Sequence, residues 1–188
     1  DQLVVATNQN DILHRTIATN DMSRQALNVT LSPSMDIMVS SNFERLLFDA
    51  HGRDSAALAD LMARFNAGDV TLNDEAWKYV KENFDSYKVD DTRTCDVISE
   101  VFNSTQYLLD PHTAIGLEAA RQCWKNKSVP MITLATAHPV KFPEAVEKAG
   151  CQSPSLPEHM KDLFEREEAY EVIDNDLAAV QGFVAERI

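Results

Sequence analysis

The sequence predicts an α/β fold, in which a helix-rich chain carries part of a parallel β-sheet. Two short segments, residues 3–6 and 131–135, are apolar apart from Thr133, as expected of strands buried on both faces. Each precedes a polar turn and then a helical pattern, which is the order of elements in α/β folds. Residues 170–173 are a weaker third candidate. Because two parallel strands are too few for a stable buried sheet, we expect the partner strands to lie in sequence N-terminal to Asp1.

The predicted helices follow from apolar residues at helical spacing and from residues that begin or end helices. Asp54, Asn73 and Asp110 are of the types that accept hydrogen bonds from the free N–H groups of a first turn. Pro111 suits a first helical position, and Gly150 suits a helix end. After the first strand a helix begins near residue 12. The other expected helices are 41–50, 54–66, 73–84, one that opens at 91 or 92, 110–124, 143–150, 158–167 and 176–187.

We expect the chain to have two parts. Residues 1–155 belong to a large domain that includes a helical insert at about 54–108. Residues 156–188 form a C-terminal helical tail. The segment 153–157 contains two prolines and two serines, which favour a loop between the parts.

Composition restricts the class of protein and its compartment. The net charge is −13, which would repel a polyanion, so we expect no nucleic-acid partner. The three cysteines form no C-x-x-C pair and the histidines no H-x-x-x-H pair, which argues against a disulfide framework and a metal site. No apolar run reaches the roughly 18–20 residues that span a bilayer, and no signal peptide is visible. These features favour a cytoplasmic protein.

Four segments are richer in small polar residues than a core requires: 6–11, 32–37, 40–45 and 134–139. Ligands of open α/β sheets bind at the C-terminal ends of the strands. Thr7 and Asn8 follow the first predicted strand, and Thr136 and His138 follow the second. Turn chemistry explains the same residues equally well, and a capping role suffices for His112 at the helix that starts with Asp110.

Ser41, Asn42 and Arg45 lie where a helix is expected to begin. Free N–H groups and the positive end of the helix dipole favour an anion there, and the three side chains add donors. They are therefore candidates for binding a phosphate or a carboxylate. The alternative is that Ser41 or Asn42 only caps the helix while Arg45 pairs with a surface acid.

The same segments resemble the bacterial and fungal type of threonine synthase. The matching runs are ATNQNDILHR (6–15), SPSMDI (32–37) with SNFERLLF (41–48), LLDPHTAIGLEAA (108–120) and LATAHPVKFPEAV (134–146). Any one of them is weak alone, but together they occur in the family's order, with similar spacing from residue 1 to about 165. Residues 66–91 and those after 164 match poorly.

The resemblance implies the C-terminal part of a fold-type-II enzyme that uses pyridoxal 5′-phosphate (PLP). Such an enzyme converts O-phospho-L-homoserine and water to L-threonine and phosphate. The resemblance implies that the hydroxyl of Thr136 lies beside the pyridine nitrogen of the cofactor. It suggests that Ser41, Asn42 and Arg45 bind the substrate phosphate, with Ser34 and Asn10 as further substrate-binding candidates.

The cofactor-binding lysine segment of the family and its glycine-rich phosphate loop are not found in this sequence, whose five glycines are scattered. We therefore expect no catalytic residue in this chain, no activity of the chain alone, and a partner in the N-terminal part of the same enzyme. Two alternatives remain. The chain belongs to another fold-type-II PLP lyase or a threonine-synthase-like homologue, or it is a non-catalytic helical interaction domain.

Overall fold

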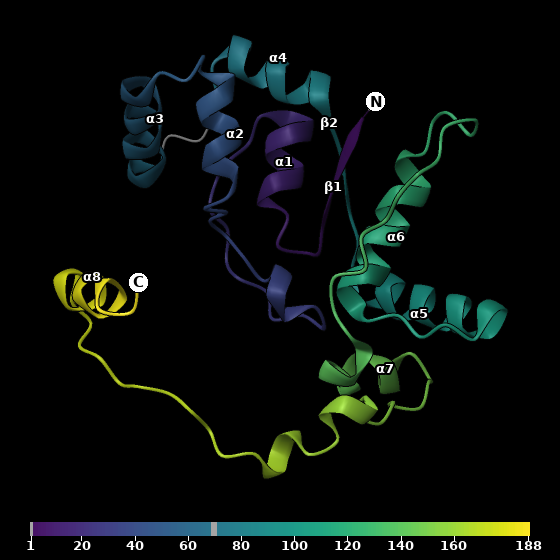
Figure 1. Cartoon of the computed structure of the whole chain (residues 1–188). Helices are drawn as coiled ribbons and strands as arrows, with labels where there is room; N and C mark the ends of the chain where they lie inside the picture. Colours follow the sequence, from purple (N-terminus) through teal and green to yellow (C-terminus); the bar gives the residue numbers. More distant parts are fainter. Residues whose placement is uncertain (1, 69–70) are drawn as a thin grey trace. The chain divides into compact units, whose positions relative to one another are not determined.

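A computed structural model describes residues 2–68 and 71–188 of the chain (Figure 1). It confirms the predicted class, because the described part is rich in helices and its strands form a parallel pair. The chain divides into two compact units, Asp1–Pro154 and Ser155–Ile188. The first unit contains β1 (Leu3–Thr7), α1 (Ile12–Thr19), the 3-10 turn η1 (Pro33–Met35), α2 (Phe43–Ala50), α3 (Ser55–Ala67), α4 (Asp74–Asn83), β2 (Phe84–Lys88), α5 (Asp91–Thr105), α6 (Pro111–Cys123), η2 (Pro139–Lys141) and α7 (Pro143–Lys148).

The sheet of the described region consists of β1 and β2, which pair in parallel with Leu3 opposite Phe84 and Thr7 opposite Lys88. The first predicted strand is therefore confirmed. The second strand was not predicted, because helix α4 was expected to continue to about Phe84. The region 54–108 thus contains β2 as well as helices.

Polar residues in β2 hide its strand character in the sequence. Asp85 and Ser86 interrupt any apolar run, but neighbouring side chains satisfy both of them. Lys125 Nζ lies 2.5 Å from Asp85 Oδ2, and His14 Nδ1 lies 2.9 Å from Ser86 Oγ. These partners are 40 and 72 residues away in sequence, so local pattern could not reveal them.

Helices cover the strand pair from both sides (Figure 1). On one side α1 packs on the strands, and α2, α3 and α4 add the apolar residues of one core. That core includes the buried side chains Ile12, Ile17, Leu47, Leu61, Phe65 and Val80. On the other side α6 packs on β1 and β2, and α5 and α7 complete a second core around Val97, Ile98 and Ala114.

A buried carboxylate joins α5 to α6. Glu118 is only 3% exposed, and its Oε2 accepts a hydrogen bond of 2.9 Å from Arg93 Nη2. Gln122 Nε2 donates to the other oxygen at 2.7 Å. The ion pair sets the position of α6 against α5, and hence of the residues at the start of α6.

Residues 131–135 do not form the second predicted strand. They return along α6 as an extended loop (Figure 1), with Ile132 81% exposed and Leu134 74% exposed. A strand needs a neighbour to which its N–H and C=O groups can bond, and no described segment takes that place. Apolar composition alone was misleading here.

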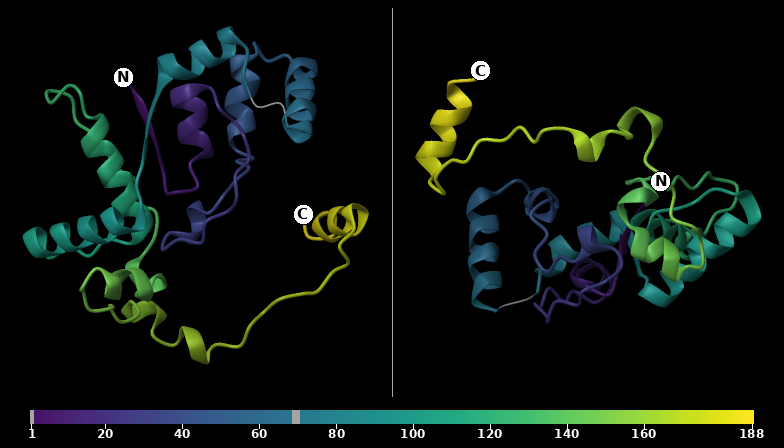
Figure 2. Two further views of the ribbon diagram at one scale, coloured as in Figure 1. Left: turned by 180° about the vertical axis from the view of Figure 1, so that it is seen from behind. Right: turned by 90° about the horizontal axis from the view of Figure 1, so that it is seen from below.

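The second unit contains the 3-10 turns η3 (Glu158–Met160) and η4 (Leu163–Glu165) and helix α8 (Leu177–Ala185), with an extended segment between η4 and α8 (Figure 2). The predicted helix over 158–167 was wrong, because this stretch forms two short turns with exposed side chains and buries no apolar stripe. Residues 170–173 are an exposed loop, not a strand. Among the described helices, none is both long and apolar enough to cross a bilayer.

Candidate functional site

The end of β1 and the loop before α2 meet in a network of buried polar side chains. Asn8, which is 1% exposed, directs its Nδ2 at Thr30 Oγ1 (2.8 Å), Ser32 Oγ (2.9 Å) and Asp36 Oδ1 (2.8 Å). Asp36 also accepts from the hydroxyl of Thr30 at 2.7 Å and from its backbone N–H at 3.0 Å. The network ties the loop of residues 30–36 to the carboxyl end of the strand.

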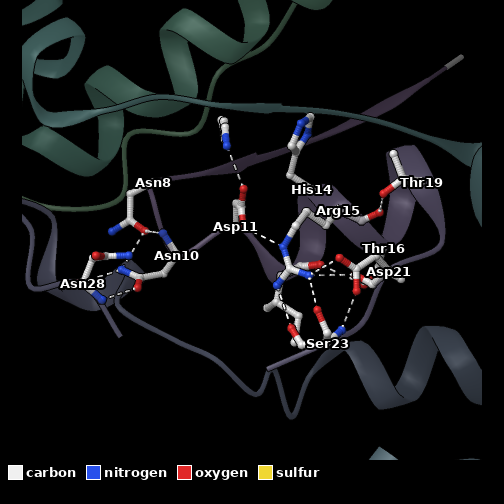
Figure 3. Close-up of polar contacts among 12 residues, drawn as sticks. Asn8, Asn10, Asp11, His14, Arg15, Thr16, Thr19, Asp21, Ser23 and Asn28 are labelled. Carbon is white, nitrogen blue, oxygen red and sulfur yellow. Dashed lines mark hydrogen bonds and ion pairs between the residues drawn. The ribbon is translucent and has the colours of Figure 1, made fainter. Parts of the chain in front are cut away.

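Asn10 belongs to the same network (Figure 3). Its Nδ2 donates to the carbonyl of Asn28 at 2.8 Å and to Asp36 Oδ1 at 2.9 Å, and its Oδ1 accepts from the Asn28 N–H at 2.8 Å. The amide of Asn10 is 3% exposed and is thus occupied by the protein itself. Its position makes it a support of the loop.

An arginine holds the start of α1 to the loop that follows the helix (Figure 3). Arg15 Nε donates to Asp11 Oδ1 at 2.8 Å, Nη1 to Asp21 Oδ2 at 2.6 Å, and Nη2 to the carbonyl of Ser23 at 2.7 Å. Lys88 Nζ, at the end of β2, lies 2.9 Å from Asp11 Oδ2. Burial raises the pKa of Asp11, but the hydrogen bonds and charges of Lys88 and Arg15 outweigh it and bring this pKa below its ordinary value.

Helix α6 begins with a buried cluster of Asp110, His112 and Thr113. Asp110 Oδ1 accepts from the backbone N–H of His112 at 2.9 Å and of Thr113 at 3.3 Å, so it caps the helix as its sequence position indicated. The same oxygen lies 2.9 Å from His112 Nδ1, and the Thr113 hydroxyl donates to Oδ2. Burial raises the pKa of Asp110, but these donors outweigh it and bring the pKa below its ordinary value.

The α6 cluster connects two of the other polar segments. The backbone N–H of Ser34, in η1, donates to His112 Nε2 at 3.2 Å. The backbone N–H of Thr136 donates to Thr113 Oγ1 at 3.1 Å. Segments 6–11, 32–37 and 134–139 are therefore linked in one chain of hydrogen bonds through the start of α6.

Thr136 lies beside an open hollow of about 250 Å³. The hollow is lined by residues 107–110, Thr113, Ala135, Ala137, His138, Pro139 and Pro154. His138 Nδ1 accepts from the Val140 N–H at 3.2 Å, which makes it the cap of η2, as expected of a loop histidine. The side chain of Thr136 is exposed, and no residue of the described chain bonds its hydroxyl.

Ser41, Asn42 and Arg45 lie at the exposed start of α2. Asn42 occupies the N-cap position but its side chain does not cap the helix. Its Oδ1 accepts a hydrogen bond of 2.7 Å from Arg45 Nη2 instead. Within residues 2–68 and 71–188, these three residues make no hydrogen bond with Asn10, Ser34 or Thr136. The structure thus joins three of the four predicted segments and leaves the fourth exposed.

Sequence reasoning missed the residues that hold the segments together. Thr30, Ser32 and Asp36 were not singled out individually, and neither were Arg15 or Thr113. Asp36 stands in the quoted run SPSMDI, and a carboxylate among small polar residues could have signalled a loop-binding role. The partner of Arg15 at i−4, Asp11, was the available signal for the start of α1.

Gly116 lets the segment that carries Thr136 pack against α6. A Cβ added at this helical position would lie 3.4 Å from Thr133 Cγ2, an ordinary contact distance. Gly116→Ala should therefore raise the free energy of unfolding by about 0.5–1 kcal/mol, because alanine favours a helix more than glycine does. Gly116→Leu should push residues 131–137 away, loosen the chain around the exposed Lys125 and Lys127 and so speed trypsin cleavage after them. Denaturation and limited proteolysis test both variants, and a strongly destabilised alanine variant would contradict the packing described.

Comparisons with known proteins agree on one family. A family model described as "Threonine synthase, C-terminal" matches residues 113–184. The threonine synthase of Pseudomonas aeruginosa is 58% identical over 187 residues, which make up 98% of this chain and 40% of that protein. The threonine synthase of Schizosaccharomyces pombe is 35% identical over 173 residues, or 79% of this chain and 34% of that protein.

Solved structures give the same result. The PLP-bound threonine synthase from Brucella melitensis matches with a TM-score of 0.84 and 42% identity, over 98% of this chain and 40% of that one. Yeast threonine synthase matches with a TM-score of 0.79 and 31% identity, over 98% of this chain and 42% of that one. The chain spans about 40% of the length of these relatives. It belongs to the threonine synthase family and corresponds to the C-terminal part of those enzymes.

Proposed function

We propose that this chain is the C-terminal part of an enzyme that converts O-phospho-L-homoserine and water to L-threonine and phosphate with PLP. The observation that carries the proposal is the 58% identity to the Pseudomonas aeruginosa threonine synthase across 98% of the chain. The N-terminal part of the same enzyme would supply the cofactor lysine and the phosphate loop. Residues 1–155 would then complete the large domain and residues 156–188 a C-terminal tail, in a cytoplasmic enzyme.

Thr136 fits a contact with PLP. Its backbone is fixed by the 3.1 Å hydrogen bond to Thr113, its hydroxyl is exposed, and its neighbours Ala135 and Ala137 line the hollow beside α6. A hydroxyl can bond the pyridine nitrogen without a charge, and therefore does not favour protonation of the ring. When bound, PLP supplies a conjugated ring that accepts electron density from the substrate.

The start of α2 fits the phosphate of the substrate. The Asn42 side chain does not cap the helix, and the N–H groups of Phe43 and Arg45 bond the carbonyls of Ser40 and Asn42 instead. Arg45 stands one turn on, and among the described residues its side chain bonds Asn42 alone. An anion at such a helix start gains the positive end of the helix dipole, a hydrogen bond from the Ser41 hydroxyl and the charge of the guanidinium. Ser34, in η1, would contact the substrate. Asn10 would contribute by holding the loop of residues 30–36 in place.

Phosphate release tests the proposal. The whole enzyme, with the N-terminal part that its relatives possess, should release phosphate from O-phospho-L-homoserine and form threonine in equal amount. The human protein named Threonine synthase-like 2 is 36% identical over 170 residues, 88% of this chain, so a synthase-like homologue with another activity is the second candidate. Phosphate release without threonine would favour that candidate, and a folded, PLP-loaded enzyme that releases no phosphate would refute the threonine synthase activity.

Arg45→Ala should raise the KM for O-phospho-L-homoserine by about tenfold or more, because a charge-assisted contact to the phosphate is lost. PLP affinity should not change. Arg53→Ala is the matched control, because Arg53 pairs with Asp49 at the surface and has no proposed role. Steady-state kinetics and cofactor titration provide the measurements. An unchanged KM in Arg45→Ala would rule out the anion site at α2.

A further inference from the structure

His112 is a buried histidine whose two ring nitrogens face different groups. It is 7% exposed and lies at the second position of α6. Nδ1 is 2.9 Å from Asp110 Oδ1, and Nε2 is 3.2 Å from the backbone nitrogen of Ser34. The ring also meets the edge of Phe142, with centroids 4.5 Å apart. A packing role would need only the last of these contacts.

The two polar contacts fix the tautomer of His112. The pKa of Asp110 is lowered, so its carboxylate can only accept, and Nδ1 must carry the proton. A backbone N–H can only donate, so Nε2 must be bare. His112 is therefore a neutral imidazole that donates to Asp110 and accepts from Ser34. Asp110 orients the ring, and the ring orients η1.

Hydrogen bonds hold the turn η1 at its centre and through the residue that follows it. Asp36, directly after the turn, is bound by Asn8, Asn10 and Thr30. At the centre of the turn, the Ser34 N–H has His112 Nε2 as its acceptor. The exposed Ser34 side chain projects from this doubly fixed backbone. Losing the His112 contact would leave the turn held only through its flanking residues, Ser32, which accepts from Asn8, and Asp36.

We propose that His112 is a positioning residue, which fixes the Ser34 turn so that the turn can receive the substrate. This inference rests on the proposed function and assigns a role to a residue outside the candidate contacts. Positioning within a fraction of an ångström matters because a displacement of about 1 Å can cost roughly a hundredfold in rate or binding. His112 acts through Ser34 and touches no substrate itself.

Two substitutions of His112 test the contacts of its two ring nitrogens separately. His112→Gln places an amide group near the Nε2 position, where its oxygen can accept from Ser34. His112→Asn places an amide near the Nδ1 position, where it can donate to Asp110 but cannot reach Ser34. Both variants shorten the side chain and lose part of the Phe142 contact, so each is the packing control of the other.

The test uses the whole enzyme with PLP. For His112→Asn we expect the KM for O-phospho-L-homoserine to rise about tenfold or more, with kcat changed by less than about threefold. His112→Gln should stay within about threefold of the wild type in both. Hydrogen exchange by mass spectrometry over residues 30–36 should show the Ser34 amide protected in the wild type and in His112→Gln, and unprotected in His112→Asn.

Equal KM values in the two variants would overturn the proposal, and so would an Asn variant with a protected Ser34 amide. If the wild type releases no phosphate, the proposed function fails, and the exchange experiment still decides whether His112 fixes the turn. If neither variant folds, ¹⁵N spectra of the histidine rings in the wild type decide. A proton on Nε2 of His112 refutes the role, and a proton on Nδ1 alone supports it.

Discussion

Replacing Arg15 with leucine is expected to lower the free energy of unfolding by about 2–4 kcal/mol. The Arg15 side chain is 13% exposed and that of Asp11 is 8% exposed, so the variant leaves a carboxylate largely shielded from water. Lys88 still pairs with Asp11, so the loss of unfolding free energy is smaller than for a buried charge without any partner. Asp21 and the Ser23 carbonyl lose a donor as well. Chemical denaturation followed by circular dichroism measures the effect.

Arg53→Leu is a closely matched control. Arg53 Nε lies 2.8 Å from Asp49 Oδ1, the same i,i+4 spacing and distance as Arg15 and Asp11. Arg53 is 76% exposed, however, and an exposed pair gains little because water solvates both charges. We expect no measurable change in the denaturation midpoint. Equal effects of the two substitutions would mean that the burial of the Arg15 network does not contribute to stability.

The contrast between these two arginines shows what the sequence could predict about the fold. Helix starts at Asp54, Asn73 and Asp110 were predictable because a cap acts on N–H groups two or three residues away. Strand β2 was not, because its polar residues are satisfied by His14 and Lys125, which lie far away in the chain. The strand predicted at residues 131–135 was wrong for the opposite reason. Their composition suits a strand, but a strand also needs a paired neighbour.

The candidate site was also only partly predictable from the sequence. The four segments could be found in the sequence because they are richer in small polar residues than a core requires. The roles of single residues could not, because each depends on a partner from another segment. Asn10 is occupied by Asn28 and Asp36, and Ser34 is tied to His112, which is 78 residues away.

Asp110→Ala is expected to lower the free energy of unfolding by about 2–4 kcal/mol, the combined cost of a lost cap and of buried donors without an acceptor. Asp54→Ala is the control. Asp54 also caps a helix by accepting two backbone N–H groups, at 2.8 Å and 3.1 Å, but it is exposed and bonds no side chain of the described residues. Its loss should cost about 1 kcal/mol. Similar costs for both would mean that His112 and Thr113 gain nothing from the Asp110 carboxylate.

The effect of Asp110→Ala should also depend on pH. Because the folded protein lowers the pKa of Asp110 below its ordinary value of 3.8, the unfolded chain takes up the proton first as the solution is acidified. The stability that Asp110 contributes is therefore complete above the unfolded pKa and is lost as the pH falls through the folded pKa. The difference between wild type and Asp110→Ala should be constant near neutral pH and should shrink in strong acid. A difference that grows on acidification would mean that Asp110 is protonated in the folded state, and His112 would then no longer be confined to the Nδ1-protonated form that binds Ser34.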